Sequence, residues 1–177
     1  VLVGDDVEGA LTRALLDAGA DVRTWCDDLR DELAVPEGVR TPTPTPADGW
    51  RPDVVLWRLP KGLGALEDVA ERLSAALPAD GRVLAGGRIK HMTHGQNDVL
   101  ARSFADVSAS LGRQKSRVLR ASGPRRPDPT WPRRALVDEV GLTVVAHGGV
   151  FSGHRLDDGT RLLLLSLGRA AAEGGGR

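Results

Sequence analysis

The sequence has a single cysteine, few aromatic residues and no excess of charge of either sign. Cys26 is the only cysteine among 177 residues, which excludes an internal disulfide and a cysteine-based zinc site within one chain. Basic and acidic residues number 24 each, so binding to a polyanion would depend on local clusters of basic side chains. Aromatic residues make up 3%, and platforms for base stacking are therefore scarce.

Long hydrophobic runs are also missing. No stretch approaches the roughly 20 apolar residues that span a bilayer, and no basic segment followed by an apolar one marks a leader. Together with the single cysteine, this favours a cytoplasmic protein without a membrane partner. Hydrophobic residues at 41% and charged residues at 27% lie near globular averages, so we expect the chain to fold.

Apolar segments and turn residues alternate over the first two thirds of the chain. Short apolar runs predict strands at residues 1–3, 20–25, 53–59 and 83–85. Apolar residues at helical spacing predict helices at residues 7–16, 63–77 and 96–104, and residues 27–33 predict a short acidic helix or turn. Strands that alternate with helices imply right-handed crossovers and a mostly parallel sheet.

The sheet is expected to end in an antiparallel pair, because residues 105–111 and 116–121 read as strands joined by a short turn. The predicted fold class is α/β and Rossmann-like, with a mostly parallel sheet that ends in an antiparallel hairpin. This is the layout of class I methyltransferase folds. The repeated Thr-Pro within residues 36–52 predicts a surface loop or edge, with a polyproline II ligand segment as the alternative.

The composition changes after residue 121. Residues 122–134 are rich in proline and arginine and predict a linker. A second hairpin is predicted with its turn at Gly141, followed by an apolar helix over residues 157–167. The predicted division of the chain is a domain at 1–121, a linker at 122–134, a further segment at 135–169 and a mobile tail at 170–177.

Few residues are arranged as catalytic or cofactor sites usually are. The first turn, residues 4–6 (GDD), lacks the spaced glycines of a dinucleotide-binding loop, and its carboxylates would repel a phosphate. His91 and His94 have a spacing that suits a metal, but no third ligand adjoins them, so we predict a polar loop and no metal site. No G-x-S-x-G motif supports nucleophilic catalysis.

Three groups of basic residues are better candidates for a binding surface. The first two groups follow consecutive parallel strands, so we expect them at one edge of the sheet, where open α/β sheets bind ligands. A solvated surface without a ligand is the alternative. The groups are Arg58 with Lys61, Arg88 with Lys90 and His91, and Arg113 with Lys115, Arg117 and Arg120.

Several segments of the chain resemble one enzyme family. Residues 58–67 (RLPKGLGALE), 83–91 (VLAGGRIKH) and 112–119 (GRQKSRVL) resemble the N-terminal domain of bacterial ribosomal RNA guanine-N2 methyltransferases. These are the two-domain enzymes called small-subunit methyltransferase C and large-subunit methyltransferase G. Residues 149–153 (GVFSG) and 156–163 (LDDGTRLL) are similar to the opening of the catalytic domain in that family.

The resemblance implies an S-adenosylmethionine-dependent enzyme of which this chain is the noncatalytic part. In the family a cofactor loop and an Asn-Pro-Pro-aromatic motif follow the LD-G-T segment, and the chain stops before either. Residues 4–6 (GDD) and 59–61 (LPK) stand where the first domain would carry such motifs and look degenerate. We therefore expect no S-adenosylmethionine binding and no activity by this chain alone. Phe151, Asp157 and Thr160 are expected to help shape the cofactor pocket of the intact enzyme, with an ordinary helix start as the alternative.

The resemblance also implies ribosomal RNA and the intramolecular catalytic domain as partners. One alternative is a purely structural domain that stabilises the catalytic half without binding RNA. Another is an autonomous methyltransferase that uses its degenerate sites. The residues expected to contact RNA phosphates are Lys61, Arg88, Lys90, Arg113, Lys115 and Arg117.

Overall fold

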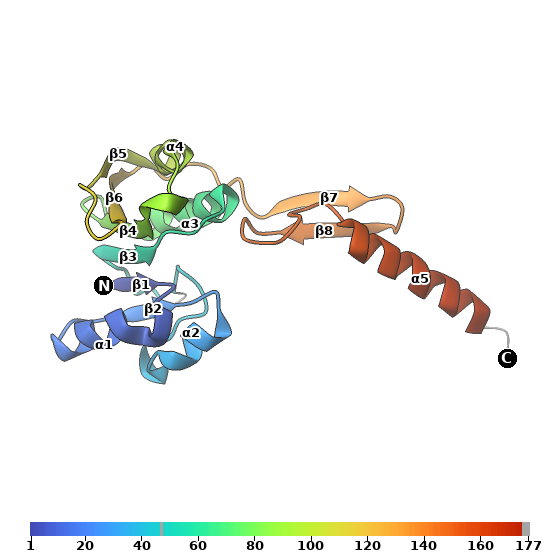
Figure 1. Ribbon diagram of the computed structural model, residues 1–177, viewed down its shortest axis with the longest axis horizontal. Helices are drawn as coiled ribbons and strands as arrows, with labels where there is room; N and C mark the ends of the chain where they lie inside the picture. The colour runs from blue at the N-terminus through green and yellow to red at the C-terminus, as the bar shows by residue number, and fades with distance from the viewer. Residues whose placement is uncertain (47, 175–177) are drawn as a thin grey trace.

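The computed structural model describes residues 1–46 and 48–174, and Figure 1 shows an α/β domain from which a hairpin and a long helix project. The domain contains a six-stranded sheet with the order β2-β1-β3-β4-β6-β5. Strands are parallel from β2 to β4, whereas β6 is antiparallel to both β4 and β5. The predicted mostly parallel sheet with a terminal antiparallel hairpin is therefore confirmed. The strands are β1 (Leu2–Gly4), β2 (Arg23–Trp25), β3 (Val54–Arg58), β4 (Arg82–Arg88), β5 (Phe104–Ala109) and β6 (Ser116–Pro124).

Two helices, α3 and α4, cover one face of the sheet. In α3 the residues Leu66, Ala70, Leu73 and Leu77 recur at helical spacing and are fully buried against the sheet. α4 begins with a capping box in which Thr93 and Gln96 exchange hydrogen bonds. The helices of the domain are η1 (Val7–Gly9), α1 (Ala10–Asp17), α2 (Leu29–Ala34), η2 (Glu37–Val39), α3 (Leu63–Ala76), η3 (Ile89–His91) and α4 (His94–Ser103).

The opposite face of the sheet is covered only near β1 and β2, where α1 and α2 lie (Figure 1). The carboxylate of Asp6 accepts hydrogen bonds from the amides of Leu11 and Thr12 at 3.2 and 2.7 Å and so satisfies the start of α1. Farther along, Leu56 and Leu84 are half-buried and line an open groove. This uneven cover leaves the middle of that face open beside α1.

Two predicted boundaries inside the domain were wrong. The strand predicted at residues 83–85 continues to Arg88, because Gly86 pairs with Val118 and Arg88 with Ser116 on β6. The strand predicted at residues 20–25 begins only at Arg23. In both cases the partner strand, and not the local sequence, decides where pairing stops.

A two-stranded hairpin and a helix follow the domain, as the sequence predicted. The hairpin joins β7 (Arg133–Val137) to β8 (Leu142–Ala146), with Gly141 in the left-handed region at φ 63°. The helix, α5 (Asp158–Gly174), ends later than predicted and includes the described part of the predicted tail, while residues 175–177 lie outside the described residues. β6 runs to Pro124, past the boundary expected at residue 121; the division into domains itself stays a prediction. None of the described helices is long and apolar enough to cross a membrane.

Candidate nucleic-acid interface and the carboxyl edge of the sheet

The structure brings Lys61, Arg88 and Lys90 together at the carboxyl edge of the sheet. β3 and β4 are parallel neighbours, with Arg58 paired to Gly86, so the residues that follow them emerge at the same edge. Lys61 comes soon after β3, and Lys90 lies with His91 in η3 directly after β4. Desolvation and the positive charges of Lys61, Lys90 and Arg88 lower the pKa of His91, which places all three cations in its vicinity.

The turn between β5 and β6 adds Lys115 to this group. The amide of Ile89 donates to the carbonyl oxygen of Lys115 at 2.9 Å, and Arg88, Lys90 and Lys115 line one shallow depression. Gln114 and Lys115 have φ angles of 51° and 59°, as the two central residues of a tight hairpin turn between Arg113 and Ser116 require. We call Lys61, Arg88, Lys90 and Lys115 the basic surface.

Two other predicted residues are less closely placed. Arg117 is paired with Gly87 across the strands, and its side chain lines a depression with Met92 and His94 at the start of α4. Side chains alternate along a strand, so Arg117 points to the helix-covered side of β6. Arg113 lies at the turn, where its backbone pairs with Ser116. The structure thus joins four of the six predicted residues and places the other two at the margin.

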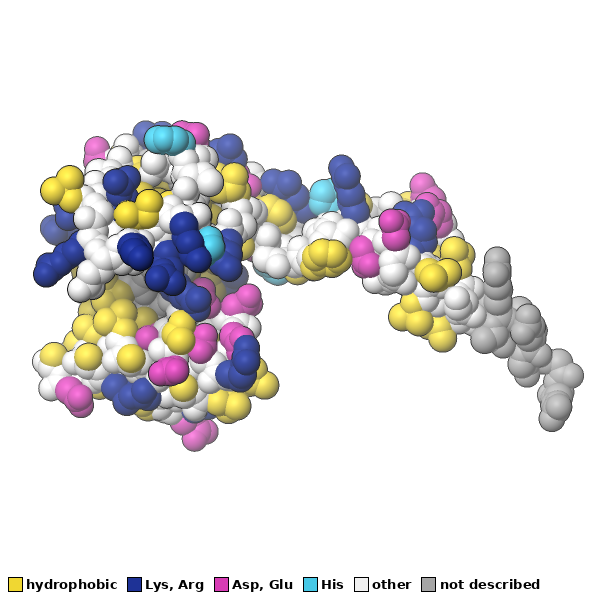
Figure 2. Space-filling view, in the orientation of Figure 1, with side chains coloured by type: hydrophobic (Ala, Val, Ile, Leu, Met, Phe, Trp, Pro, Cys, Tyr) yellow, Lys and Arg dark blue, Asp and Glu magenta, His cyan; other side chains and the backbone are white. Residues whose placement is uncertain are grey.

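The positive charge of the basic surface is not neutralised by ion pairs. All four side chains are exposed. The ion pairs found among the described residues involve Arg23, Arg30, Arg102, Arg133, His147 and Arg161, and none of the four. Figure 2 shows a dense group of dark-blue Lys and Arg side chains beside a His over the ends of β3 and β4, with acidic side chains gathered below it around α1 and α2. Such a surface attracts polyanions despite zero net charge.

The first turn of the fold is occupied by the protein's own side chains. A Cβ at Gly4 would lie 2.2 Å from Cη2 of Trp25 and 2.7 Å from Cδ1 of Trp57, so the indole rings fill the space that this glycine leaves open. The carboxylate of Asp5 accepts from the amide of Asp27 at 2.9 Å, and desolvation raises the Asp5 pKa. With the α1 amides held by Asp6, this turn presents carboxylates where a phosphate would need donors.

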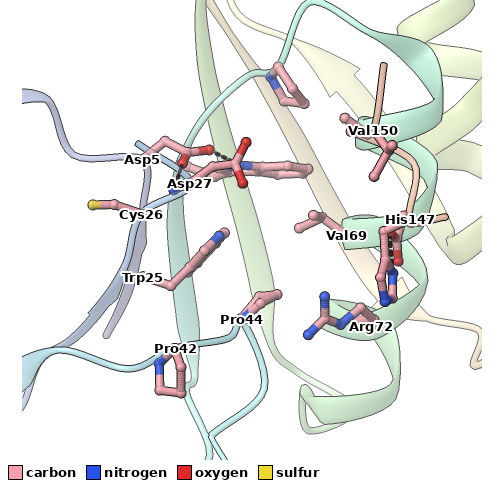
Figure 3. A pocket seen from close by; sticks show the side chains of 15 residues that line it. Asp5, Trp25, Cys26, Asp27, Pro42, Pro44, Val69, Arg72, His147 and Val150 are labelled. Atoms are coloured by element: carbon pink, nitrogen blue, oxygen red, sulfur yellow. Dashed lines mark hydrogen bonds and ion pairs between the residues drawn. The ribbon is translucent and has the colours of Figure 1, made fainter. Parts of the chain in front are cut away.

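A cavity of about 360 Å³ opens beside this turn, between the ends of β1, β2 and β3, the helix α3 and the residues after β8. Figure 3 shows Asp5 and Asp27 on one side of it and Arg72 and His147 on the other. The walls between them are largely apolar. They are formed by Trp25, Pro42, Pro44, Trp57, Pro60, Val69 and Val150.

Carboxylates of α3 attach the predicted linker to the domain, a feature that the sequence did not reveal. Glu71 accepts from the amide and the hydroxyl of Thr130 at 2.9 and 2.6 Å. Glu67 accepts from the indole of Trp131 and from Arg133, each at 3.3 Å. The available signal was an acidic residue at buried positions of an apolar helix, since Glu71 is 8% exposed and a buried carboxylate needs partners.

A third carboxylate of α3 holds the end of the hairpin. Asp68, which is 4% exposed, pairs with Nδ1 of His147 at 2.8 Å and accepts from the amide of Gly148 at 3.0 Å. The backbones approach so closely here that a Cβ at Gly148 would lie 2.0 Å from the carbonyl oxygen of Gly64. The projecting hairpin is therefore fixed to α3 at both of its ends. We call Glu67, Asp68 and Glu71 the α3 clamp.

Of the residues expected near a cofactor, Asp157 and Thr160 lie at the start of α5, which projects away from the sheet (Figure 1), whereas Phe151 directly follows Val150, a residue that lines the cavity. Asp157 accepts from the hydroxyl of Thr160 at 2.6 Å and from its amide at 3.2 Å. These hydrogen bonds lower the pKa of Asp157 and cap the helix. Phe151 is 85% exposed. No hydrogen bond among the described residues joins it to Asp157 or Thr160. Among residues 1–46 and 48–174, no cluster of three His, Cys, Asp or Glu side chains suits a metal, and this includes the surroundings of His91 and His94.

Residues 1–125 match the family model of the RLMG N-terminal domain. The chain belongs to this family. The curated ribosomal RNA large subunit methyltransferase G of Pseudomonas entomophila (strain L48) is 38% identical over 119 residues, which cover 66% of this chain and 32% of that protein. The enzyme of the same name from Pseudomonas putida (strain W619) is 32% identical over 181 residues, or 96% of this chain and 48% of that protein. The chain thus spans about a third to a half of these relatives.

Two solved structures that superpose on the chain are methyltransferases. The T. thermophilus 16S rRNA N2 G1207 methyltransferase (RsmC), solved with AdoMet and guanosine, superposes with a TM-score of 0.65 at 18% identity, over 96% of this chain and 48% of that one. A ribosomal protein L11 methylase from Lactobacillus delbrueckii subsp. bulgaricus gives 0.55 at 18% identity, over 70% and 69% of the two chains. At this identity the likeness establishes the class I methyltransferase fold, as the sequence predicted.

Proposed function

We propose that this chain is the noncatalytic N-terminal part of an S-adenosylmethionine-dependent ribosomal RNA (guanine-N2) methyltransferase, and that it engages RNA through the basic surface. The observation that carries the proposal is the convergence of Lys61, Arg88, Lys90 and Lys115, from three separate segments, on one edge of the sheet without an acidic partner. Lysine and arginine in such a cluster bind phosphates and fix the position of RNA without reading its sequence. Arg113 and Arg117 extend this surface at its margin. The expected compartment is the cytoplasm, where ribosomal RNA is modified.

The noncatalytic role is supported by the poor fit of the first turn to S-adenosylmethionine. In the intact enzyme this cofactor supplies the methyl group. In this domain the indole of Trp25 fills the space next to Gly4, where the backbone of a cofactor loop would have to stay uncovered. The relatives are longer than the matched part, so we assign the cofactor to a part of the protein outside this chain. Phe151, Asp157 and Thr160 remain candidates for that pocket only in the intact enzyme.

A second function, support of the catalytic part, is favoured by the α3 clamp. Three carboxylates on neighbouring turns of α3 hold residues 130–148 in a fixed position. A segment held in this way keeps the catalytic part of the enzyme at a fixed position relative to the basic surface. A purely structural role would need the clamp but not the basic surface, and the two roles therefore separate by mutation.

Charge reversal tests the proposed RNA contact. Lys61→Glu and Lys90→Glu are each expected to weaken binding to fragments of ribosomal RNA in a filter-binding or anisotropy titration. The plot of log affinity against log salt should lose about one unit of slope for each phosphate contact removed. Arg82→Glu is the matched control, because Arg82 is an exposed residue at the opposite end of β4. Unchanged RNA affinity in both lysine variants would refute the proposed RNA contact.

A further inference from the structure

The cavity beside the first turn lies where an open α/β sheet is built to hold a ligand. β1 lies in the sheet between β2 and β3, so the connections that leave these strands diverge to opposite sides. The carboxyl ends of such diverging strands form a crevice, which is the usual ligand position in this class of fold. Trp25 and Asp27 come from the end of β2, and Trp57 and Pro60 from the end of β3.

This cavity has two polar sides, with carboxylate acceptors on one and the guanidinium of Arg72 on the other. Asp5 and Asp27 lie opposite Arg72 across the cavity, while His147, on the side of Arg72, is already paired with the lining carboxylate of Asp68 (Figure 3). Neither the carboxylate of Asp27 nor the guanidinium of Arg72 takes part in the ion pairs found among the described residues. A ligand that fits has a flat or apolar body, donors on one edge and acceptors on another. The carboxylates disfavour a phosphate inside the cavity.

The mouth of the cavity adjoins the basic surface. Pro60 lines the cavity and Lys61 is the next residue. Arg58, at the end of β3, lies close enough to Asp5 to act on its charge. An RNA strand with its phosphates on the basic surface therefore has its nucleotides beside this opening. Proteins commonly read single-stranded RNA by taking an unstacked base into such a pocket and bonding its edges.

We propose that this cavity receives an unpaired guanine base of the RNA bound on the basic surface, an inference that rests on the proposed function. Guanine alone among the four bases has two adjacent donors, N1–H and N2–H, that one carboxylate accepts together. Its other edge carries the acceptors O6 and N7, which are the usual partners of an arginine fork. Asp27 takes the first edge and Arg72 the second, while the prolines and Val69 flank the ring.

The test compares nine-nucleotide uridine oligomers that carry G, A, C or U at the central position, titrated by fluorescence anisotropy against the full chain. The guanine oligomer is expected to bind about tenfold tighter than the others, the discrimination that one good bidentate contact gives. Asp27→Asn and Arg72→Gln should each remove this preference, so that each variant binds the four oligomers with equal affinity. Asp98→Asn, an exposed carboxylate on α4, should retain it. Circular dichroism checks that the variants are folded.

Free guanosine tests the cavity without the basic surface. It is expected to quench the fluorescence of Trp25 and Trp57 in the wild type and in Lys61→Glu, but not in Asp27→Asn, whereas adenosine has no such effect. Equal affinity for the four oligomers, preference for another base, or a guanine preference that survives in both cavity variants overturns the inference. Loss of oligouridine affinity in Lys61→Glu without any guanine preference refutes this inference alone. Unchanged oligouridine affinity in both lysine charge-reversal variants refutes the proposed function instead.

Discussion

The amide and hydroxyl groups of Thr130 donate to the two carboxylate oxygens of Glu71 at 2.9 and 2.6 Å. Glu71 is 8% exposed, so alanine at this position leaves two donors of the linker without an acceptor where water has little access. We expect Glu71→Ala to lower the free energy of unfolding by about 1–3 kcal/mol and to open residues 125–134 to trypsin. Urea denaturation and timed proteolysis measure the two effects.

The matched control for this variant is Glu37→Ala, because Glu37 is exposed in η2 and makes no side-chain hydrogen bond among the described residues. Glu71→Gln should fall between the two, since the amide keeps one acceptor oxygen for Thr130. If Glu71→Ala unfolds and is cleaved like the wild type, the linker is not held by this carboxylate.

Neighbouring glycines at the end of the hairpin give a second prediction. A Cβ at Gly148 would lie 2.0 Å from the carbonyl oxygen of Gly64, whereas a Cβ at Gly149 meets nothing nearer than Cβ of Ala65 at 3.9 Å. Backbone cannot move aside as a flexible side chain can, so Gly148→Ala should detach residues 147–148 from α3. Gly149→Ala should leave them in place. Hydrogen exchange of the Gly148 amide, which donates to Asp68, reports the difference, and equal protection in the two variants would contradict it.

The packing of Trp25 over Gly4 gives a third prediction. Gly4→Ala places a Cβ 2.2 Å from the indole, and overpacking of this kind costs about 1–3 kcal/mol. Gly86→Ala is the control, because Gly86 also lies in a central strand but a Cβ there has no neighbour within 4 Å. We expect a lower melting temperature for Gly4→Ala only. Replacement of Trp25 by Leu in the Gly4→Ala background should recover part of the loss, and a failure to recover any would place the strain elsewhere.

Most strands and the main helices could be predicted because their signals are local. The helical spacing of Leu66, Leu73 and Leu77 is visible in the sequence and is what buries α3. The predicted end of the strand at residue 85 was wrong because the pairing of Gly86 with Val118 depends on a strand some thirty positions away. α5 continues beyond residue 167 because alanines 170–172 favour a helix even without an apolar period.

The candidate site could likewise be predicted only in part. Lys61 and Lys90 follow parallel strands, so their meeting at one edge followed from topology alone. The separation of Arg117 from them depends on which face of β6 it occupies, which is a matter of register. The α3 clamp could not be predicted from the sequence, because the partners of Asp68 and Glu71 lie 80 and 59 residues later in the chain. Acidic residues on an amphipathic helix are more often solvated than bonded.

The thiol of Cys26 gives a prediction about pH. Desolvation, helped by the charges of Asp5, Asp31 and Asp6 against one backbone hydrogen bond, raises its pKa from 9.0 to about 11. The thiolate fraction at neutral pH then falls about 100-fold, while the higher basicity of the thiolate restores about tenfold of its reactivity, so alkylation should run about tenfold slower than for an ordinary cysteine. The rate with iodoacetamide, followed by mass spectrometry, should return to the ordinary value in urea.

The same shift has a consequence for stability with a definite sign. The folded chain holds the Cys26 proton more tightly than the unfolded chain, so the protonated thiol stabilises the fold relative to the ionised one. Its contribution is fully present below about pH 9 and is lost as the pH rises toward 11. We expect the free energy of unfolding of the wild type to fall over this interval relative to Cys26→Ala. Parallel pH profiles of the two proteins would show that the thiol does not have the raised pKa.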